Sequence, residues 1–185
     1  MWKKIFPNYG NDMTDPGGNM ILGLDASTSC CGWAFYNGIT IVDAGFIDLT
    51  KMETNKEKAF HVISSLKDHP YLSETTVINL EAALSGFFRG RTSQQTIIKL
   101  ARFNAVFEYI ISETLKIPVN LVSVTTARKK VFGKCRVKGI DPKEYVKQQL
   151  SLKLDLTKFD KFNKIGNWDK RNGDTYDAMV QAYCG

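Results

Sequence analysis

The sequence predicts an α/β domain built around a five-stranded mixed sheet. Short apolar and β-branched runs, which are typical of strands, alternate with longer segments of helical periodicity. They follow one another as three strands, a helix, a strand, a helix, a strand and further helices, an order that indicates one sheet flanked by helices. The 185 residues and the 43% hydrophobic content suit a single domain with its own core.

The first three strands are predicted to form an antiparallel meander. Residues 20–25 and 31–36 are apolar runs bounded by small residues. Asn37-Gly38 then predicts a two-residue hairpin turn, with residues 39–48 as the return strand. Two later strands are expected to be parallel, which completes the mixed sheet.

The later elements follow from apolar periodicity and from capping residues. A polar, basic segment over residues 154–172 is predicted to be a loop. The expected elements are a helix over 53–67, a strand over 75–80 that ends at Glu81, a long helix over 93–116 that Thr92 or Ser93 can cap, a strand over 118–124, a short helix that Thr125 or Thr126 can cap and that ends near Gly133, a helix over 141–153 and a last helix from about Gly173.

Apolar side chains cover more than one stripe of the long 93–116 helix. Such wide coverage predicts that the helix is central in the fold or that it contacts a second subunit. The apolar positions are Ile97, Ile98, Leu100, Ala101, Phe103, Val106, Phe107, Ile110, Ile111 and Leu115.

The charge of the chain favours a polyanionic partner. The formal net charge is +6, although many basic proteins bind nothing special.

No apolar run approaches the roughly 20 residues that span a membrane, and no signal peptide is expected, so we expect a cytoplasmic location. Residues 1–19, rich in Gly, Pro, Asn and Asp, are interpreted as an arm before a domain over 20–185. The four cysteines are expected to be reduced.

Four carboxylates stand at the ends of predicted elements. Asp25 ends the first strand, and Glu81 ends the fourth strand before a glycine-containing loop. Asp174 and Asp177 open the last helix, where a spacing of three residues places them on one face. Each acid alone has a structural explanation, as a turn residue, a loop carboxylate or a charge at a helix N-terminus. Together they predict a site for a hard divalent cation, which prefers several oxygen ligands.

These residues resemble the motifs of RuvC-type Holliday junction resolvases, a branch of the RNase H-like nucleases. The resemblance covers residues 20–185. Its parts are Leu24-Asp25-Ala26-Ser27 with Cys31-Gly32-Trp33-Ala34, then Glu81, Thr96-Ile97-Ile98-Lys99-Leu100, Lys130-Val131-Phe132-Gly133 and Asp174-Thr175-Tyr176-Asp177-Ala178-Met179. The chain departs from the family at Ser27, where a glycine is usual, and in the length of its 154–172 segment, which suggests a divergent and perhaps viral or phage member.

The resemblance implies an RNase H-like fold in which the first and fourth strands are neighbours. It also implies an endonuclease that resolves four-way DNA junctions as a homodimer, leaving 5′-phosphate and 3′-hydroxyl ends. Asp25, Glu81, Asp174 and Asp177 would be both the catalytic residues and the ligands of Mg²⁺, or alternatively Mn²⁺, with two ions per active site. Two such ions can activate water and stabilise the leaving oxygen.

Two alternatives stay open at this stage. One is a branched-DNA-binding protein without cleavage, and the other is an RNase H-like nuclease that acts on other branched DNA or on hybrids. An actin-like or sugar-kinase ATPase needs two such domains, whereas this chain is long enough for one.

Basic and aromatic residues near these acids are the predicted DNA contacts. Phosphate contacts from such residues would position the DNA and weaken with salt. Phe87 and Phe88 are expected to stack on bases or to wedge between them, with burial under their loop an equally good alternative. The remaining candidates are Arg89, Arg91, Lys99, Arg128, Lys129, Lys130, Lys134, Arg136, Lys138 and Lys143.

Overall fold

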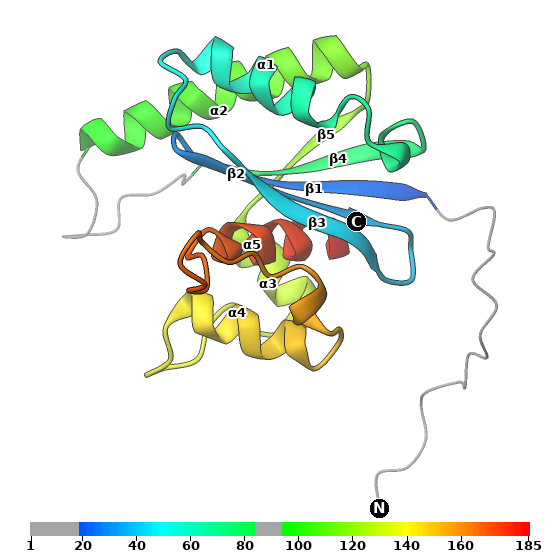
Figure 1. Ribbon diagram of the computed structural model, residues 1–185, viewed down its shortest axis with the longest axis vertical. Coiled ribbons are helices and arrows are strands. Elements are labelled where there is room, and N and C mark those ends of the chain that lie inside the picture. The colour runs from blue at the N-terminus through cyan, green and yellow to red at the C-terminus, as the bar shows by residue number, and fades with distance from the viewer. Residues whose placement is uncertain (1–18, 84–93) are drawn as a thin grey trace, which may run out of the picture.

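The computed structural model, which describes residues 19–83 and 94–185, is a five-stranded sheet with helices on both faces (Figure 1). The strand order is β3-β2-β1-β4-β5. The elements are β1 (Met20–Ala26), β2 (Cys30–Tyr36), β3 (Ile41–Asp48), α1 (Asn55–Leu66), η1 (Pro70–Leu72), β4 (Thr75–Glu81), α2 (Gln94–Leu115), β5 (Val119–Val122), α3 (Val124–Phe132), α4 (Pro142–Ser151), η2 (Leu156–Lys158) and α5 (Asn172–Tyr183).

The predicted mixed sheet is confirmed. β1 pairs antiparallel with β2 and β2 antiparallel with β3, whereas β4 lies parallel to both β1 and β5. The helices α1 and α2 cover one face of the sheet, and α3, α4 and α5 lie on the other (Figure 1). The parallel pair β1 and β4 therefore lies in the middle of the sheet, buried on both faces, as its apolar sequence indicates.

Two local predictions were wrong. The turn after β2 has four residues, because the Asn37 side chain accepts hydrogen bonds from the backbone of Ile39 and Thr40 and delays the return strand to Ile41. The N-cap of α3 is Ser123, whose hydroxyl accepts from the Thr126 amide at 3.1 Å, so neither Thr125 nor Thr126 is the cap. The predicted caps of α2 at Thr92 and Ser93 lie outside the described residues.

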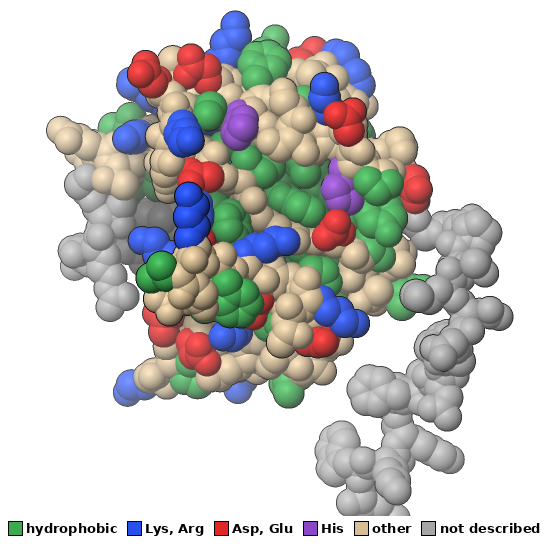
Figure 2. Space-filling view, viewed as in Figure 1, with side chains coloured by type: hydrophobic (Ala, Val, Ile, Leu, Met, Phe, Trp, Pro, Cys, Tyr) green, Lys and Arg blue, Asp and Glu red, His purple; other side chains and the backbone are tan. Residues whose placement is uncertain are grey.

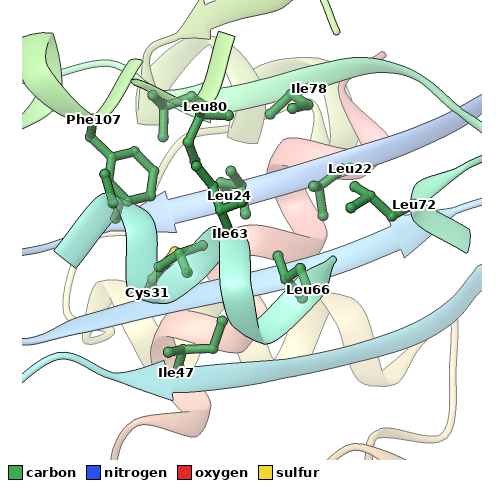
Figure 3. Packing of buried hydrophobic residues seen from close by; sticks show 14 of the residues in the cluster. Leu22, Leu24, Cys31, Ile47, Ile63, Leu66, Leu72, Ile78, Leu80 and Phe107 are labelled. Atoms are coloured by element: carbon green, nitrogen blue, oxygen red, sulfur yellow. The ribbon is translucent and has the colours of Figure 1, made fainter. Parts of the chain in front are cut away.

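Alternation along the central strands sorts their side chains between two cores. Leu22 and Leu24 of β1, with Ile78 and Leu80 of β4, point toward α1 and α2 and pack there with Phe107 (Figure 3). The intervening residues of both strands face the other way, toward α5. The residues next in this alternation are Asp25 and Glu81, so both of these acids belong to the α5 face.

Helix α5 lies directly on the sheet because two strand positions have no side chain. A Cβ on Gly23 would stand 2.2 Å from the Ala178 carbonyl oxygen, and one on Gly32 would stand 2.0 Å from that of Asp174. Real Cβ atoms do not approach backbone this closely. The two glycines therefore fix how near the start of α5 comes to β1 and β2.

We predict that Gly32→Ala moves the start of α5 away from the sheet and lowers the free energy of unfolding by about 3 kcal/mol, the upper part of the range for overpacking. Chemical denaturation measures the change. Gly133→Ala is the control, because its Cβ would meet nothing and only its positive φ of 77° opposes the substitution, at about 1 kcal/mol. Equal losses in the two variants would contradict this account of the helix position.

Candidate active site

Two of the predicted carboxylates meet at the ends of neighbouring parallel strands. Leu24 of β1 is in register with Leu80 of β4, so Asp25 and Glu81 leave their strands at the same level and on the same face. The two side chains are close enough for each to shift the pKa of the other. On the other side of β1, Asp25 is in register with Gly32, the residue over which the Asp174 backbone lies.

The other two carboxylates come from the first turns of α5. Asp177 is buried, and Asp174 is partly exposed. Both lie within electrostatic range of Asp25, since both raise the pKa of its carboxyl. The structure thus brings together all four acids that the sequence singled out, and the strand ends and α5 position them.

Burial and mutual repulsion disfavour the ionised forms of this group. Desolvation raises the pKa of Asp25 well above its ordinary value, and Glu81, Asp177 and Asp174 raise it further. Desolvation, followed by the charge of Asp177, raises the pKa of Glu81 to about 7. Desolvation also raises the pKa of Asp177 despite the opposing effect of Arg128. The group therefore carries negative charge that the fold only partly compensates.

Two cations provide that partial compensation. Arg128 of α3 donates from Nη2 to Asp177 Oδ1 at 2.8 Å, and each side chain is only 10% exposed. Lys143, at the start of α4, donates from Nζ to Asp174 Oδ1 at 2.7 Å and is 56% exposed. Arg128 is thus an internal partner of Asp177, whereas Lys143 lies at the rim of the site.

Three polar residues that the sequence did not single out support the carboxylates. Gln181, one turn after Asp177, has a side-chain hydrogen bond with Glu81. Asn79 donates to the Gln181 carbonyl at 3.0 Å, and Asn104 of α2 donates to the Glu81 carbonyl at 3.0 Å. Gln181 could have been found from the sequence, because its spacing of four residues from Asp177 places both on one face of α5. The partners of Asn79 and Asn104 depend on tertiary packing.

The turn after Asp25 explains how the chain accommodates Ser27, where the resembled family usually has a glycine. Its hydroxyl accepts from the Cys30 amide at 3.1 Å and donates to the Cys30 carbonyl at 2.9 Å. The side chain thus closes the tight connection between β1 and β2. The serine is therefore compatible with the position of Asp25.

The donor chemistry of the site fits a hard divalent cation, because all four groups are carboxylates and two or more positive charges would relieve their repulsion. As arranged in the described residues, however, no three His, Cys, Asp or Glu side chains are gathered closely enough to hold a metal ion. Asp174 and Asp177 are instead turned to Lys143 and Arg128. A bound cation would require the acids to shift toward one another.

The predicted DNA contacts fall into three groups. Arg128 is buried against Asp177, which corrects its prediction as a direct phosphate contact. Phe87, Phe88, Arg89 and Arg91 lie outside the described residues. The exposed ones are Lys99, Lys129, Lys130, Lys134, Arg136, Lys138 and Lys143. Within that exposed set, Lys130 donates to the Cys184 carbonyl at 2.6 Å, so its head group is held at the C-terminal end.

Cys30, Cys31, Cys135 and Cys184 are free thiols. Desolvation raises the pKa of the Cys30 and Cys31 thiols, which makes them poor nucleophiles. Within residues 19–83 and 94–185, no helix has the length and apolar character needed to cross a membrane.

The fold is that of RuvC-type resolvases. The chain is similar to RuvC of Thermus thermophilus in complex with a Holliday junction substrate, at 10% identity and a TM-score of 0.54, over 88% of this chain and 91% of that one. It is also similar to the yeast mitochondrial Holliday junction resolvase Ydc2, at 13% identity and a TM-score of 0.58, over 90% and 77% of the two chains. No protein-family model and no curated protein sequence matches the chain.

We predict that the metal-free protein loses stability as pH rises from about 4.5 to about 7. The pKa of Glu81 is higher in the folded chain than in the unfolded one, so the folded state binds more protons in this window and rising pH favours unfolding. Glu81→Gln should flatten this part of the profile and raise the free energy of unfolding at pH 8 by about 2 kcal/mol. Denaturant titrations in EDTA at several pH values measure both effects.

Glu113→Gln is the matched control, because Glu113 is an exposed glutamate paired with Lys116. Its profile should follow that of the wild type. A wild-type profile that is flat or rises between pH 4.5 and 7, with no difference in Glu81→Gln, would contradict the repulsion that we assign to the site.

Proposed function

We propose that this protein is a metal-dependent endonuclease that resolves four-way DNA junctions. The observation that carries the proposal is the group Asp25, Glu81, Asp174 and Asp177, partly or fully buried and gathered by two parallel strand ends and one helix. The fold shared with two junction resolvases of known structure supports the same substrate class. The net charge of +6 suits a nucleic-acid partner.

In this proposal the four carboxylates hold Mg²⁺ or Mn²⁺, with two ions per active site. Such ions supply an activated water and stabilise the leaving oxygen in the hydrolysis of a phosphodiester. The products would carry 5′-phosphate and 3′-hydroxyl ends. Oxygen ligands alone do not distinguish Mg²⁺ from Mn²⁺.

The cations of the site have separate roles in this mechanism. Arg128 stays buried, orients Asp177 and offsets its charge. Lys143 is exposed at the rim, where its ammonium can leave Asp174 and bind an oxygen of the scissile phosphate. The exchange would free Asp174 as the substrate arrives, and substrate binding would thereby complete the ligand set.

We also propose a homodimer in which α2 supplies the two-fold interface. The buried side chains of α2 are confined to one face, at Phe103, Asn104, Phe107 and Ile111. On the outer side, Val106 and Tyr109 are exposed and line an apolar groove of about 600 Å³ that also includes Phe60 of α1. A symmetric pair of subunits would place two active sites on related strands of a junction.

One observation favours a second function, branched-DNA binding without cleavage. Asp174 and Asp177 are both neutralised by basic side chains, and the described residues hold no ready-made metal site. Under this alternative the four acids with Arg128 and Lys143 form a structural charge network. Incubation of a synthetic four-way junction with Mg²⁺ or with EDTA separates the two functions, since only the nuclease yields metal-dependent nicks.

We predict that Asp25→Asn lowers the rate of junction cleavage by at least about a hundredfold while junction binding in EDTA stays within twofold. The carboxylate lies at the centre of the group, and its loss removes a ligand without removing a basic contact. Gel assays on a labelled four-way junction measure cleavage and binding. Asp68→Asn, at an exposed carboxylate, is the control and should cleave normally. Full activity of Asp25→Asn would overturn the assignment of the site.

We predict that Tyr109→Glu converts the dimer to monomers, because burying a carboxylate in an apolar interface is costly. Sedimentation analysis at several protein concentrations measures the change. Leu152→Glu is the control, since Leu152 is as exposed as Tyr109 but follows α4 on the opposite layer. A wild type that sediments as a monomer at all concentrations would contradict the interface.

A further inference from the structure

The segment between η2 and α5 forms an ordered hairpin beside the active site. We call residues 160–169 of this segment the 160–169 hairpin. Phe162 and Trp168 form an antiparallel bridge, and the Asp169 amide donates to the Lys161 carbonyl at 3.0 Å. At the tip, Asn163 accepts through its side chain from the amides of Ile165 and Asn167, and Gly166 adopts a positive φ of 82°. The sequence had indicated only a polar, basic loop here.

Helix α5 anchors this hairpin with side chains from its first two turns. Asn172, fully buried, accepts from the Lys161 amide at 3.0 Å and donates to the Lys161 carbonyl at 2.8 Å. The Tyr176 hydroxyl donates to the Asp160 carboxylate, which also accepts from Trp168 Nε1 at 3.0 Å. These anchors alternate along α5 with Asp174 and Asp177. The hairpin and two of the four carboxylates are therefore held by the same helix.

The hairpin exposes apolar side chains although its backbone is well fixed. Phe162 is 61% exposed, Ile165 is 80% exposed and Trp168 is 39% exposed. Isolated exposed apolar residues are common, but three on one short hairpin are a candidate contact surface. The internal hydrogen bonds of the tip leave these side chains pointing outward with little backbone freedom to lose on binding.

The charge around these apolar residues is positive. Lys158, Lys161, Lys164 and Lys170 flank or belong to the hairpin, and none forms a salt bridge within the described part of the chain. The nearby acids are engaged internally, because Asp160 accepts from Tyr176 and Trp168, and Asp169 is paired with Arg171. Figure 2 shows one face of the molecule, on which Lys and Arg side chains lie among hydrophobic ones, with Asp and Glu side chains between them.

Helix α4 shows how close the hairpin lies to the carboxylates. Lys143 contacts Asp174, and Lys147, one turn later on the same face, has its Nζ 4.9 Å from the centre of the Trp168 ring. The base of the hairpin is also fixed to β3, because Arg171 pairs with Asp48 at 2.7 Å and lies over the Phe46 ring. The lysines that contact Asp174 and Trp168 are therefore one helical turn apart on α4.

We propose that the 160–169 hairpin is a second DNA-contact element, in which Phe162 and Ile165 pack against unstacked bases while Lys161 and Lys164 bind the neighbouring phosphates. Single-strand binding surfaces combine positive charge with aromatic side chains on which bases stack, and Phe162 stands here between Lys161 and Lys164. A protein partner fits less well, because the cores of protein interfaces are depleted in lysine. This inference rests on the proposed function, since the carboxylate site locates the DNA beside the hairpin.

The test measures DNA affinity in EDTA, so that cleavage plays no part. The double variant Phe162→Ser/Ile165→Ser should bind a labelled four-way junction about tenfold more weakly than the wild type, because stacking of this kind contributes a factor of that order per base. Ile39→Ser/Leu152→Ser is the matched control, with two equally exposed apolar residues beside a separate groove, and should bind within twofold of the wild type. Circular dichroism melting confirms that the variants are folded.

Two further readouts separate stacking from charge. With 2-aminopurine at the branch point, wild-type binding should increase the fluorescence, whereas Phe162→Ser/Ile165→Ser should leave it near the level of free DNA. Lys161→Gln/Lys164→Gln should reduce by about two the slope of log affinity against log salt concentration.

The outcomes distinguish the two proposals. If the wild type binds and cleaves the junction but both hairpin variants bind as tightly as the wild type, the hairpin inference is overturned and the nuclease stands. If the wild type binds branched DNA no better than a linear duplex and cleaves neither, the proposed function and the inference are overturned together.

Discussion

The direct contact between the start of α5 and the glycines of β1 and β2 is the constraint on which the site depends. Gly23 and Gly32 let the helix backbone approach the sheet more closely than any side chain would permit. That approach places Asp174 and Asp177 beside the strand-end acids Asp25 and Glu81. It also leaves little room for adjustment of α5, because the contact is between backbone atoms that cannot rotate away.

Charge repulsion is the cost of this arrangement. Desolvation and neighbouring acids raise the pKa of Asp25 and of Glu81, and Arg128 and Lys143 offset only part of the charge. A buried Arg–Asp pair seldom adds stability over apolar packing, since both ions lose their hydration. Its presence here is better explained by the orientation it gives to Asp177. The site thus loses stability and gains a local affinity for positive charge, a property that the proposed metal-dependent nuclease would require.

The same helix connects the chemistry to the surface around it. Asn172 and Tyr176 hold the 160–169 hairpin, whereas Asp174 and Asp177 of the same turns belong to the site. Lys143 and Lys147 repeat this link from α4, one reaching Asp174 and the other Trp168. Any displacement of α5 would therefore move Asp174, Asp177 and the hairpin together. In the proposed function, this coupling would fix the distance between the site of cleavage and the DNA contact of the hairpin.

Sequence patterns by themselves determined the order and kind of the helices and strands, because apolar periodicity and turn residues are local signals. They also indicated Asp25, Glu81, Asp174 and Asp177, since each acid interrupts or opens an apolar element. The sequence patterns did not identify Ser123 as the cap of α3 or the four residues of the turn after β2. Side-chain hydrogen bonds with nearby backbone groups decide which of several neighbouring residues is the cap and where the turn ends.

Only the tertiary structure decided which charges meet. Arg128 looked like one of several basic residues in a cationic stretch, but the packing of α3 against α5 buries it on Asp177, 49 positions away. The partners of Asn79 and Gln181, and the hairpin that Asn172 and Tyr176 anchor, depend likewise on contacts between distant segments. The physical reason is that periodicity records which face of an element is apolar, whereas the pairing of polar groups depends on where those faces are brought together in space.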